Sequence, residues 1–201
     1  MLITHGHFDH FSAATLSRFA GTSAFITPLG FEDLVGDLDP APARHTALDW
    51  FDSTEIHGRR ITFLPCNHWT MRNPVKGPNR RLWGSYLFES SFGPKVFIAG
   101  DTAWFDGFKA LGEAYDLDLA IFNLGAYEPR WFMKQSHMNP EETVRAFLAL
   151  KARRFMVVHW GAFQLGDEPV FLPPLALKQE LEKQGMLESW VDLKPGGTLF
   201  F

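Results

Sequence analysis

The sequence predicts an α/β fold, and three observations support this prediction. Apolar runs of strand length alternate with segments that carry helix signals along the 201 residues. Hydrophobic residues make up 46% of the chain, which is enough to build a core without disulfides. No internal repeat or low-complexity segment interrupts the alternation, so we expect a single domain over residues 1–201.

The first part of the chain predicts short helices among strands. Ser12 is a suitable N-cap, because its side chain can accept a hydrogen bond from the first turn of a helix. Pro74, Gly77 and Pro78 favour a loop. In order, we expect the end of a strand at 2–4, a helix from Ser12 to Phe19, a strand at 23–27, a helical turn at 31–35, strands within 47–57 and at 60–64, and a loop at 70–82.

The second part contains the clearest helix start in the sequence. Asn139 is placed as N-cap, Pro140 as the first helical residue and Glu142 as the third, which together predict a capping box. The other expected elements are a hairpin of 83–89 with 95–99, a helix at 104–115, strands at 119–123 and 155–158, a helix at 174–184, and a closing hairpin of 190–193 with 198–201.

Composition excludes several classes of protein. The 19 basic and 23 acidic residues give a net charge of −4, which argues against nucleic-acid binding. The single Cys excludes a disulfide framework and a four-thiolate zinc site. No apolar run is long enough to span a membrane. We therefore expect a cytoplasmic protein, with peripheral membrane contact and homo-oligomer formation left open.

A histidine-rich turn is the strongest chemical signal. In the sequence His5-Gly6-His7-Phe8-Asp9-His10, the first two imidazoles project to the same side of an extended chain and can bind one metal ion. Asp9 and His10 follow the turn and can bind a second ion beside it. These nitrogen and oxygen donors suit zinc, with iron or manganese as substitutes. A chance cluster, a purification tag and unrelated core histidines are the alternatives, and the interleaved spacing argues against each.

Further metal ligands are expected after other apolar strands. His68 follows the strand at 60–64, Asp101 follows that at 95–99, and His159 follows that at 155–158. Each residue taken singly is more often an ordinary loop residue. Because loops at strand ends converge where a sheet opens, the recurrence predicts that these three join the histidine-rich turn.

These motifs carry a resemblance to a known family. The turn at 5–10, His68, Gly100-Asp101-Thr102 and His159-Trp160-Gly161 resemble the metallo-β-lactamase superfamily of binuclear hydrolases. A narrower and more specific match is to the N-acylphosphatidylethanolamine phospholipase D branch and its bacterial relatives. It rests on the string Gly125-Ala126-Tyr127-Glu128-Pro129-Arg130-Trp131-Phe132-Met133, with His137 and Pro140-Glu141-Glu142 after it.

The resemblance implies an αββα sandwich with two zinc ions. One zinc would be bound by His5, His7 and His68, the other by Asp9, His10 and His159, with the Asp101 carboxylate bridging them. His137 matches a family residue beside the substrate phosphate, and its alternative role is a partner for the helix start at Asn139. The implied catalytic residues are Asp101, His137 and Asp9.

The implied reaction is hydrolysis of a phosphodiester in an N-acylphosphatidylethanolamine-like phospholipid. Two divalent cations lower the pKa of a shared water and polarise a phosphoryl oxygen, while His137 donates to that oxygen or protonates the leaving alcohol. Alternatives are a sugar-phosphate lactonase or a cyclic phosphodiesterase on the same scaffold, or a catalytically inactive fragment. Zinc content and a substrate panel distinguish these functions.

Two further features complete the expectations. Relatives carry additional residues before the histidine-rich turn, so we expect the 1–201 domain to be N-terminally incomplete and to lack part of its first sheet. The loop after His68 carries four cations, which are Arg72, Lys76, Arg80 and Arg81. Attraction of an anionic phosphate and simple solvation are equally weighted explanations for these cations.

Overall fold

The computed structural model describes all residues, 1–201, and contains two sheets. The smaller sheet pairs β1 (Ala24–Pro28) with β2 (Arg44–Leu48) in parallel. Leu2 adds one bridge to Ile26 on the other side of β1, which leads the chain directly into the histidine-rich turn. The smaller sheet therefore fixes the start of that turn.

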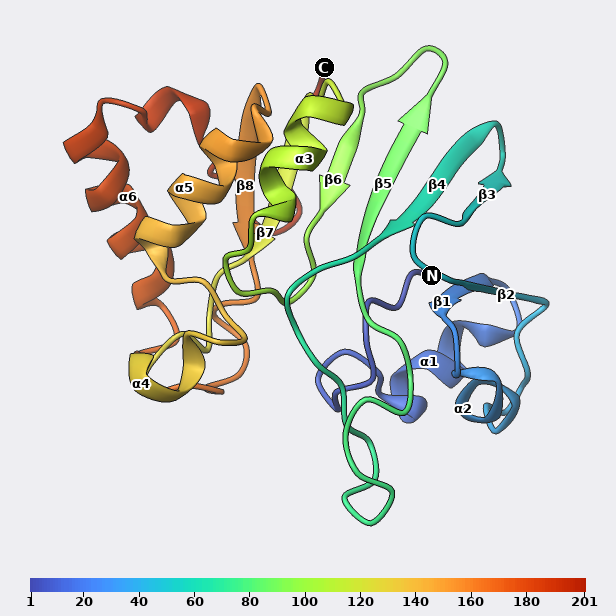
Figure 1. The fold of residues 1–201 in the computed structure, drawn as a ribbon. Helices are drawn as coiled ribbons and strands as arrows, with labels where there is room; N and C mark the ends of the chain where they lie inside the picture. Colours follow the sequence, from blue (N-terminus) through green and yellow to red (C-terminus); the bar gives the residue numbers. More distant parts are fainter.

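The larger sheet has six strands in sequence order. Neighbouring strands are antiparallel from β3 to β6 and parallel from β6 to β8 (Figure 1). It follows that β4, β6, β7 and β8 all run in the same direction and that their carboxyl ends share one edge. The six strands are β3 (Ser53–Ile56), β4 (Arg59–Leu64), β5 (Ser85–Ser90), β6 (Val96–Ile98), β7 (Leu119–Asn123) and β8 (Arg154–Val158).

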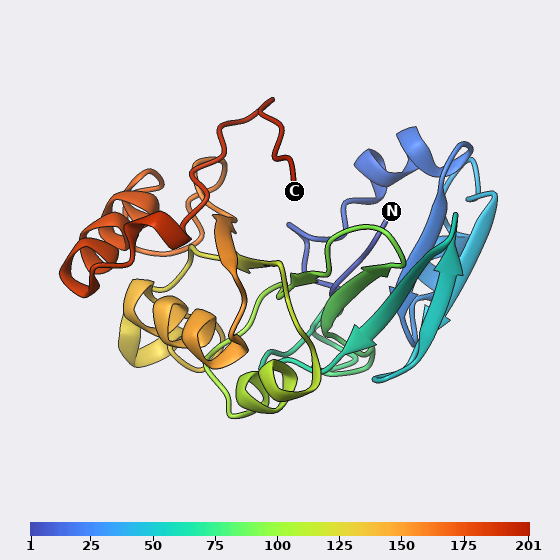
Figure 2. The same ribbon diagram turned by 90° about the horizontal axis from the view of Figure 1, so that it is seen from above.

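Helices cover the outer faces of the two sheets. The first two helices share an apolar cluster with β1, while three later helices form a larger cluster with the six-stranded sheet. Figure 2 shows the early helices and α6 at opposite sides of the molecule. The helices are α1 (Ala13–Ala20), α2 (Glu32–Gly36), α3 (Gly107–Ala114), α4 (Arg130–Met133), α5 (Pro140–Leu150) and α6 (Leu172–Gln184), followed by a 3₁₀ turn at Leu187–Ser189.

A third apolar cluster lies between the two sheets. It joins Ile26 and Leu48 of the smaller sheet to Ile61, Phe63 and Tyr86 of the larger one. The layers therefore follow the order helix, sheet, sheet, helix, and the predicted α/β sandwich is confirmed. None of the helices is both long enough and apolar enough to cross a membrane.

The predicted helix starts are present in detail. At α5 the Glu142 N–H donates to Asn139 Oδ1 at 2.9 Å, and the Asn139 N–H donates to Glu142 Oε2 at 3.1 Å. At α1 the Thr15 N–H donates to Ser12 Oγ at 3.3 Å. These local contacts depend on neighbouring residues alone, which explains why the sequence predicts them.

The predicted closing hairpin is wrong. Trp190 instead forms a parallel bridge with Phe155, and the Val191 N–H donates to the Phe155 carbonyl at 2.8 Å. The turn at 194–197 forms, but Phe200 and Phe201 after it stay exposed and belong to no strand. Pairing with the free edge of β8 takes the place of the local hairpin. The predicted helix at 104–115 also begins later than expected, at Gly107.

The capping box of α5 gives a stability prediction. Asn139→Ala leaves the first-turn N–H of Glu142 without its acceptor, so the free energy of unfolding should fall by about 1 kcal/mol. Chemical denaturation measures the change. Gln179→Ala, at an exposed position of α6, is the matched control and should change stability by less than about 0.5 kcal/mol. Equal losses in both variants would show that the cap does not stabilise α5.

Candidate metal centre

The predicted ligands meet at the shared edge of the larger sheet. His68 lies shortly after β4, Asp101 shortly after β6, and His159 directly after β8. The turn at 5–10 reaches the same place from the smaller sheet. Because the carboxyl ends of β4, β6 and β8 are neighbours, residues far apart in sequence are brought within hydrogen-bond range.

Three histidines form the first group of donors. His5 Nε2 lies 2.9 Å from His7 Nδ1, which lies 3.3 Å from His68 Nε2. Two of the outward nitrogens have protein partners, since His68 Nδ1 donates to the Ser136 carbonyl at 3.0 Å and His5 Nδ1 lies 3.0 Å from Thr4 Oγ1. The carbonyl can only accept, so the His68 proton is on Nδ1 and its inner Nε2 presents a lone pair to the group.

Burial keeps this first group neutral. It lowers the pKa of His5 well below its ordinary value and that of His68 to about 3, although the charge of Asp101 acts in the opposite direction on both. Inward lone pairs on neutral imidazoles repel each other unless a cation lies between them. The group therefore fits a metal ion.

Four residues form the second group, which carries two carboxylates. His10 Nε2 lies 3.2 Å from Asp9 Oδ2 and 3.1 Å from Asp101 Oδ2. His159 Nε2 lies 3.4 Å from the Asp9 carboxylate and 3.3 Å from His10 Nε2. All the donor atoms of this group lie within 4.8 Å of one another.

The charges of the second group require a cation. Burial acts to lower the pKa of His10, but hydrogen bonds to Asp101 and Asp9 raise it to about 10. Burial likewise acts to raise the pKa of Asp101, yet the hydrogen bond from His10 and the nearby histidines hold it well below its ordinary value. The protein alone satisfies the carboxylates with a proton on His10, and a bound metal ion would supply the same positive charge.

Asp101 faces both groups. Its Oδ2 lies 3.7 Å from His5 Nε2 and 3.9 Å from His68 Nε2, in addition to its contact with His10. Its Oδ1 accepts a hydrogen bond of 2.6 Å from Asn123 Nδ2 at the end of β7. Sequence reasoning missed Asn123, although the rule that identified Asp101, a polar residue at the end of an apolar strand, applies to it equally.

His137 lies against the cluster. Its ring centroid is 5.3 Å from that of His68 and 6.1 Å from that of His159, and with His68 and Asp101 it forms a third group able to hold a metal. The His137 carbonyl accepts a hydrogen bond of 2.9 Å from Arg130 Nη1. The ring makes no hydrogen bond to the start of α5, so the alternative role of helix partner is not supported.

A cleft of about 910 Å³ opens onto the metal-binding residues. Its wall includes the exposed side chains of Trp131 and Phe132, which belong to α4, a helix the sequence did not predict. The lining residues are His7, Phe8, Asp9, His68, Trp69, Met71, Asp101, Ala126, Trp131, Phe132, Met133, Gln135, Ser136, His137 and Leu165. The centre therefore lies in a cleft with a mixed apolar and polar wall.

The remaining histidines lie apart from the centre. His45 bonds to Thr27 Oγ1 at 2.8 Å, and His57 is exposed in the turn between β3 and β4. Within the centre, His7 Nε2 and His159 Nδ1 are buried without a hydrogen-bond partner. These are the nitrogens opposite His7 Nδ1 and His159 Nε2, which face the two donor groups.

The comparisons with known proteins identify the family. Residues 1–160 match the family model described as "Beta-lactamase superfamily domain". The chain is 33% identical to N-acyl-phosphatidylethanolamine-hydrolyzing phospholipase D 1 of Caenorhabditis elegans, over 90% of this chain and 53% of that protein. It is 30% identical to the mitochondrial N-acyl-phosphatidylethanolamine-hydrolyzing phospholipase D of Saccharomyces cerevisiae, over 96% of this chain and 41% of that protein.

A solved structure supports the fold. Igni18, a metallo hydrolase from the archaeon Ignicoccus hospitalis, superposes with a TM-score of 0.73 at 21% identity, covering all of this chain and 78% of that one. The chain spans about half the length of the curated relatives it matches. As predicted from its sequence, the chain belongs to the metallo-β-lactamase superfamily of metal-dependent hydrolases, in the branch similar to N-acylphosphatidylethanolamine phospholipases D.

Proposed function

We propose that the protein is a binuclear zinc hydrolase that cleaves a phosphodiester of N-acylphosphatidylethanolamine-like phospholipids, in the manner of a phospholipase D. The observation that carries the proposal is the pair of adjacent donor groups that Asp101 faces, in a cleft that Asp101 itself lines. The two curated relatives, named as hydrolysing this class of lipid, support the choice of substrate. We further propose that residues 1–201 form one domain.

Each of the two donor groups would bind one metal ion. His5, His7 and His68 would hold one zinc, and Asp9, His10 and His159 the other, with Asp101 between them. When bound, two divalent cations supply a water nucleophile of lowered pKa and electrostatic stabilisation of a phosphoryl oxygen. Asn123 orients the shared carboxylate through its hydrogen bond to Oδ1.

His137 would act on the substrate. It lines the cleft beside the donor groups, and its backbone is fixed by Arg130, whose Nη2 pairs with Glu142 Oε2 at 2.7 Å. From this position the imidazole would donate a hydrogen bond to the phosphoryl oxygen or a proton to the leaving alcohol. The ion pair with Glu142 ties the residue to the capped start of α5, so the ring is positioned by a rigid element.

The apolar wall suits a substrate with acyl chains. Phe8, Trp131 and Phe132 line the cleft with 70%, 78% and 62% of their surface exposed, which is costly in water unless something covers them. Acyl chains of a phospholipid would cover these rings while the phosphate lies over the donor groups. The wall is therefore consistent with a lipid and less so with a small polar ester.

Zinc content tests the metal assignment. The protein purified with zinc should contain two zinc ions per chain, and Asp101→Asn should contain fewer than one and lose activity by about a hundredfold or more, because the shared negative charge is removed. Elemental analysis and hydrolysis rates measure both. Asp106→Asn, whose side chain is 87% exposed, should behave as wild type. Two zinc ions retained in Asp101→Asn would contradict the shared-ligand assignment.

His137 is tested by separating chemistry from metal binding. His137→Gln should lower kcat by about a hundredfold, since a proton donor at the reacting group is lost, and should leave the zinc content unchanged. His57→Asn, at an exposed position with φ of 50°, is the matched control. If zinc content falls together with activity in His137→Gln, His137 is a metal ligand, as its grouping with His68 and Asp101 would allow.

A substrate panel tests the reaction itself. We expect release of an N-acylethanolamine and a phosphatidic acid from N-acylphosphatidylethanolamine, faster than hydrolysis of a sugar-phosphate lactone or a cyclic nucleotide. Mass spectrometry of the products identifies the bond that is broken. Preferred cleavage of the lactone or the cyclic diester would assign one of the alternative activities, and a zinc-loaded protein inactive on all three would indicate a non-catalytic domain.

A further inference from the structure

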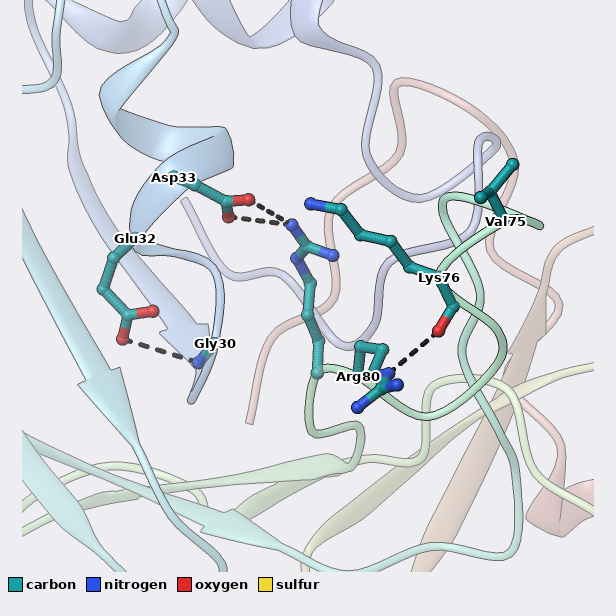
Figure 3. A pocket seen from close by; sticks show the side chains of 7 residues that line it. Gly30, Glu32, Asp33, Val75, Lys76 and Arg80 are labelled. Carbon is teal, nitrogen blue, oxygen red and sulfur yellow. Dashed lines mark hydrogen bonds and ion pairs between the residues drawn. The ribbon is translucent and has the colours of Figure 1, made fainter.

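A second cavity lies outside the metal-binding cleft. It has a volume of about 590 Å³ and is bounded by the loop at 69–82 on one side and the start of α2 on the other (Figure 3). Only one apolar residue, the almost fully exposed Val75, lines it. The lining residues are Gly30, Glu32, Asp33, Val75, Lys76, Arg80 and Arg81.

Positive charge is concentrated at this cavity. Lys76, Arg80 and Arg81 line it, and Arg72 lies next to Arg81, whose charge adds to partial burial in lowering the pKa of Arg72. The three cations that line the cavity face two carboxylates, Glu32 and Asp33, which leaves a local excess of one positive charge. The whole chain carries a net charge of −4, so the cavity contrasts with the rest of the protein.

The two carboxylates leave most of this charge unpaired. Asp33 accepts two hydrogen bonds from a single nitrogen of Arg81, at 2.8 and 2.6 Å. Glu32 is turned toward the backbone and accepts from the Gly30 N–H at 3.4 Å, away from the cations in Figure 3. Lys76 and Arg80 make no ion pair.

Several cationic donors have no acceptor. The buried Nε of Arg81 has no hydrogen-bond partner, which is a costly arrangement for a charged group. Arg80 uses only its Nε, which donates to the Lys76 carbonyl at 2.9 Å. In Figure 3 the Lys76 ammonium group extends toward Asp33, and no acceptor for it is found in the protein. An anion in the cavity would accept hydrogen bonds from Lys76 and from the Arg80 nitrogens that have no partner, and its charge would offset that of the partly buried Arg81.

The walls of the cavity are held in place. Leu82 N–H donates to the Leu29 carbonyl at 3.0 Å, and Asn79 N–H donates to the Thr70 carbonyl at 2.7 Å, which closes the loop. Gly30 has φ of 87°, and a Cβ there would lie 3.3 Å from the backbone of both Arg80 and Arg81. Close backbone packing thus fixes the backbones of the two arginines relative to α2, so that only side chains would have to be ordered on binding.

We propose that this cavity is an accessory binding site for a phosphate group, bound by Lys76, Arg80 and Arg81. Guanidinium groups match phosphate oxygens with paired donors, and a tetrahedral anion accepts hydrogen bonds from several directions at once. The phosphate would come from a soluble ester or from the headgroup of an anionic phospholipid. The site depends on neither the metal ions nor the proposed reaction.

Nuclear magnetic resonance on the zinc-loaded full chain tests the site with inorganic phosphate as the probe. The amide signals of Gly30, Asp33 and Lys76 should shift in a saturable manner with phosphate and not with chloride at equal ionic strength. Signals near the metal ligands report any phosphate bound there, so the two sites are read separately. Absence of a saturable shift at the cavity amides would overturn the proposal.

Charge variants assign the binding to the named residues. Lys76→Gln combined with Arg80→Gln should raise the Kd for phosphate by about tenfold or more, because two charge-assisted hydrogen bonds are lost. Glu32→Gln should lower the Kd, since a repelling charge is removed while the acceptor for Gly30 remains. Lys109→Gln, an exposed lysine on α3, is the matched control. Equal affinity in the double variant and in Lys109→Gln would contradict the proposal.

Vesicles distinguish the two sources of phosphate. Sedimentation with phosphatidylcholine vesicles is compared with and without phosphatidic acid, for wild type and for the Lys76→Gln and Arg80→Gln double variant. Binding that needs both phosphatidic acid and the two cations supports a headgroup ligand. Binding of inorganic phosphate without any vesicle preference supports a soluble phosphate ester. No dependence on the cations in either assay would refute the site.

Discussion

The buried charge of Asp101 is the constraint on which the metal centre depends. This residue is only 3% exposed, so water cannot stabilise its carboxylate and the protein must do so. One oxygen accepts a hydrogen bond from Asn123, and the other faces His10, His5 and His68. Removal of these groups would leave a charge that is costly to bury. The same environment attracts cations strongly, because a carboxylate shielded from water interacts with them in a medium of low dielectric constant. The position of Asp101 therefore favours metal binding, but the stability of its buried carboxylate depends on each of these neighbours.

The ligands lie on loops, yet hydrogen bonds from the surrounding backbone hold those loops. The Gly6 N–H donates to Thr70 Oγ1 at 2.9 Å, which ties the histidine-rich turn to the loop after β4. The Ser136 carbonyl orients the ring of His68, and Arg130 fixes the backbone of His137. The first two contacts join segments far apart in sequence, whereas Arg130 and His137 are seven residues apart. The directions of β4, β6 and β8 bring the loops to one edge, and these contacts then set the angles of the side chains.

Sequence patterns predicted the parts of the site that depend on local chemistry. The turn at 5–10 places its donors within six residues, and His68, Asp101 and His159 follow apolar strands, so the strand-end rule finds them. Asn123 also follows the strand-end rule, but it was missed because no motif lies beside it in the sequence. The α4 helix has no buried residue and no side-chain cap, and therefore leaves no periodic apolar signal. The prediction of a closing hairpin at the end of the chain was wrong for a different reason. Trp190 pairs with the edge of β8, a partner that only the tertiary structure provides.

The loop at 69–82 shows how one segment can serve two cavities. Its first residues, Trp69 and Met71, line the cleft, whereas Lys76 and Arg80 line the second cavity. Arg72 interacts with both sides. Its guanidinium lies 4.2 Å from the ring centroid of Phe8 at the cleft, and the charge of Arg81 at the second cavity contributes to lowering the pKa of Arg72. Anion binding near Arg81 would lower the positive potential at Arg72 and so weaken the repulsion between the two arginines. Because Arg72 also contacts the His7 carbonyl at 3.5 Å, a change in its position reaches the backbone of a predicted metal ligand. Arg72 thus contacts residues of the cleft directly and interacts electrostatically with Arg81 at the second cavity, which gives a physical route for coupling between them.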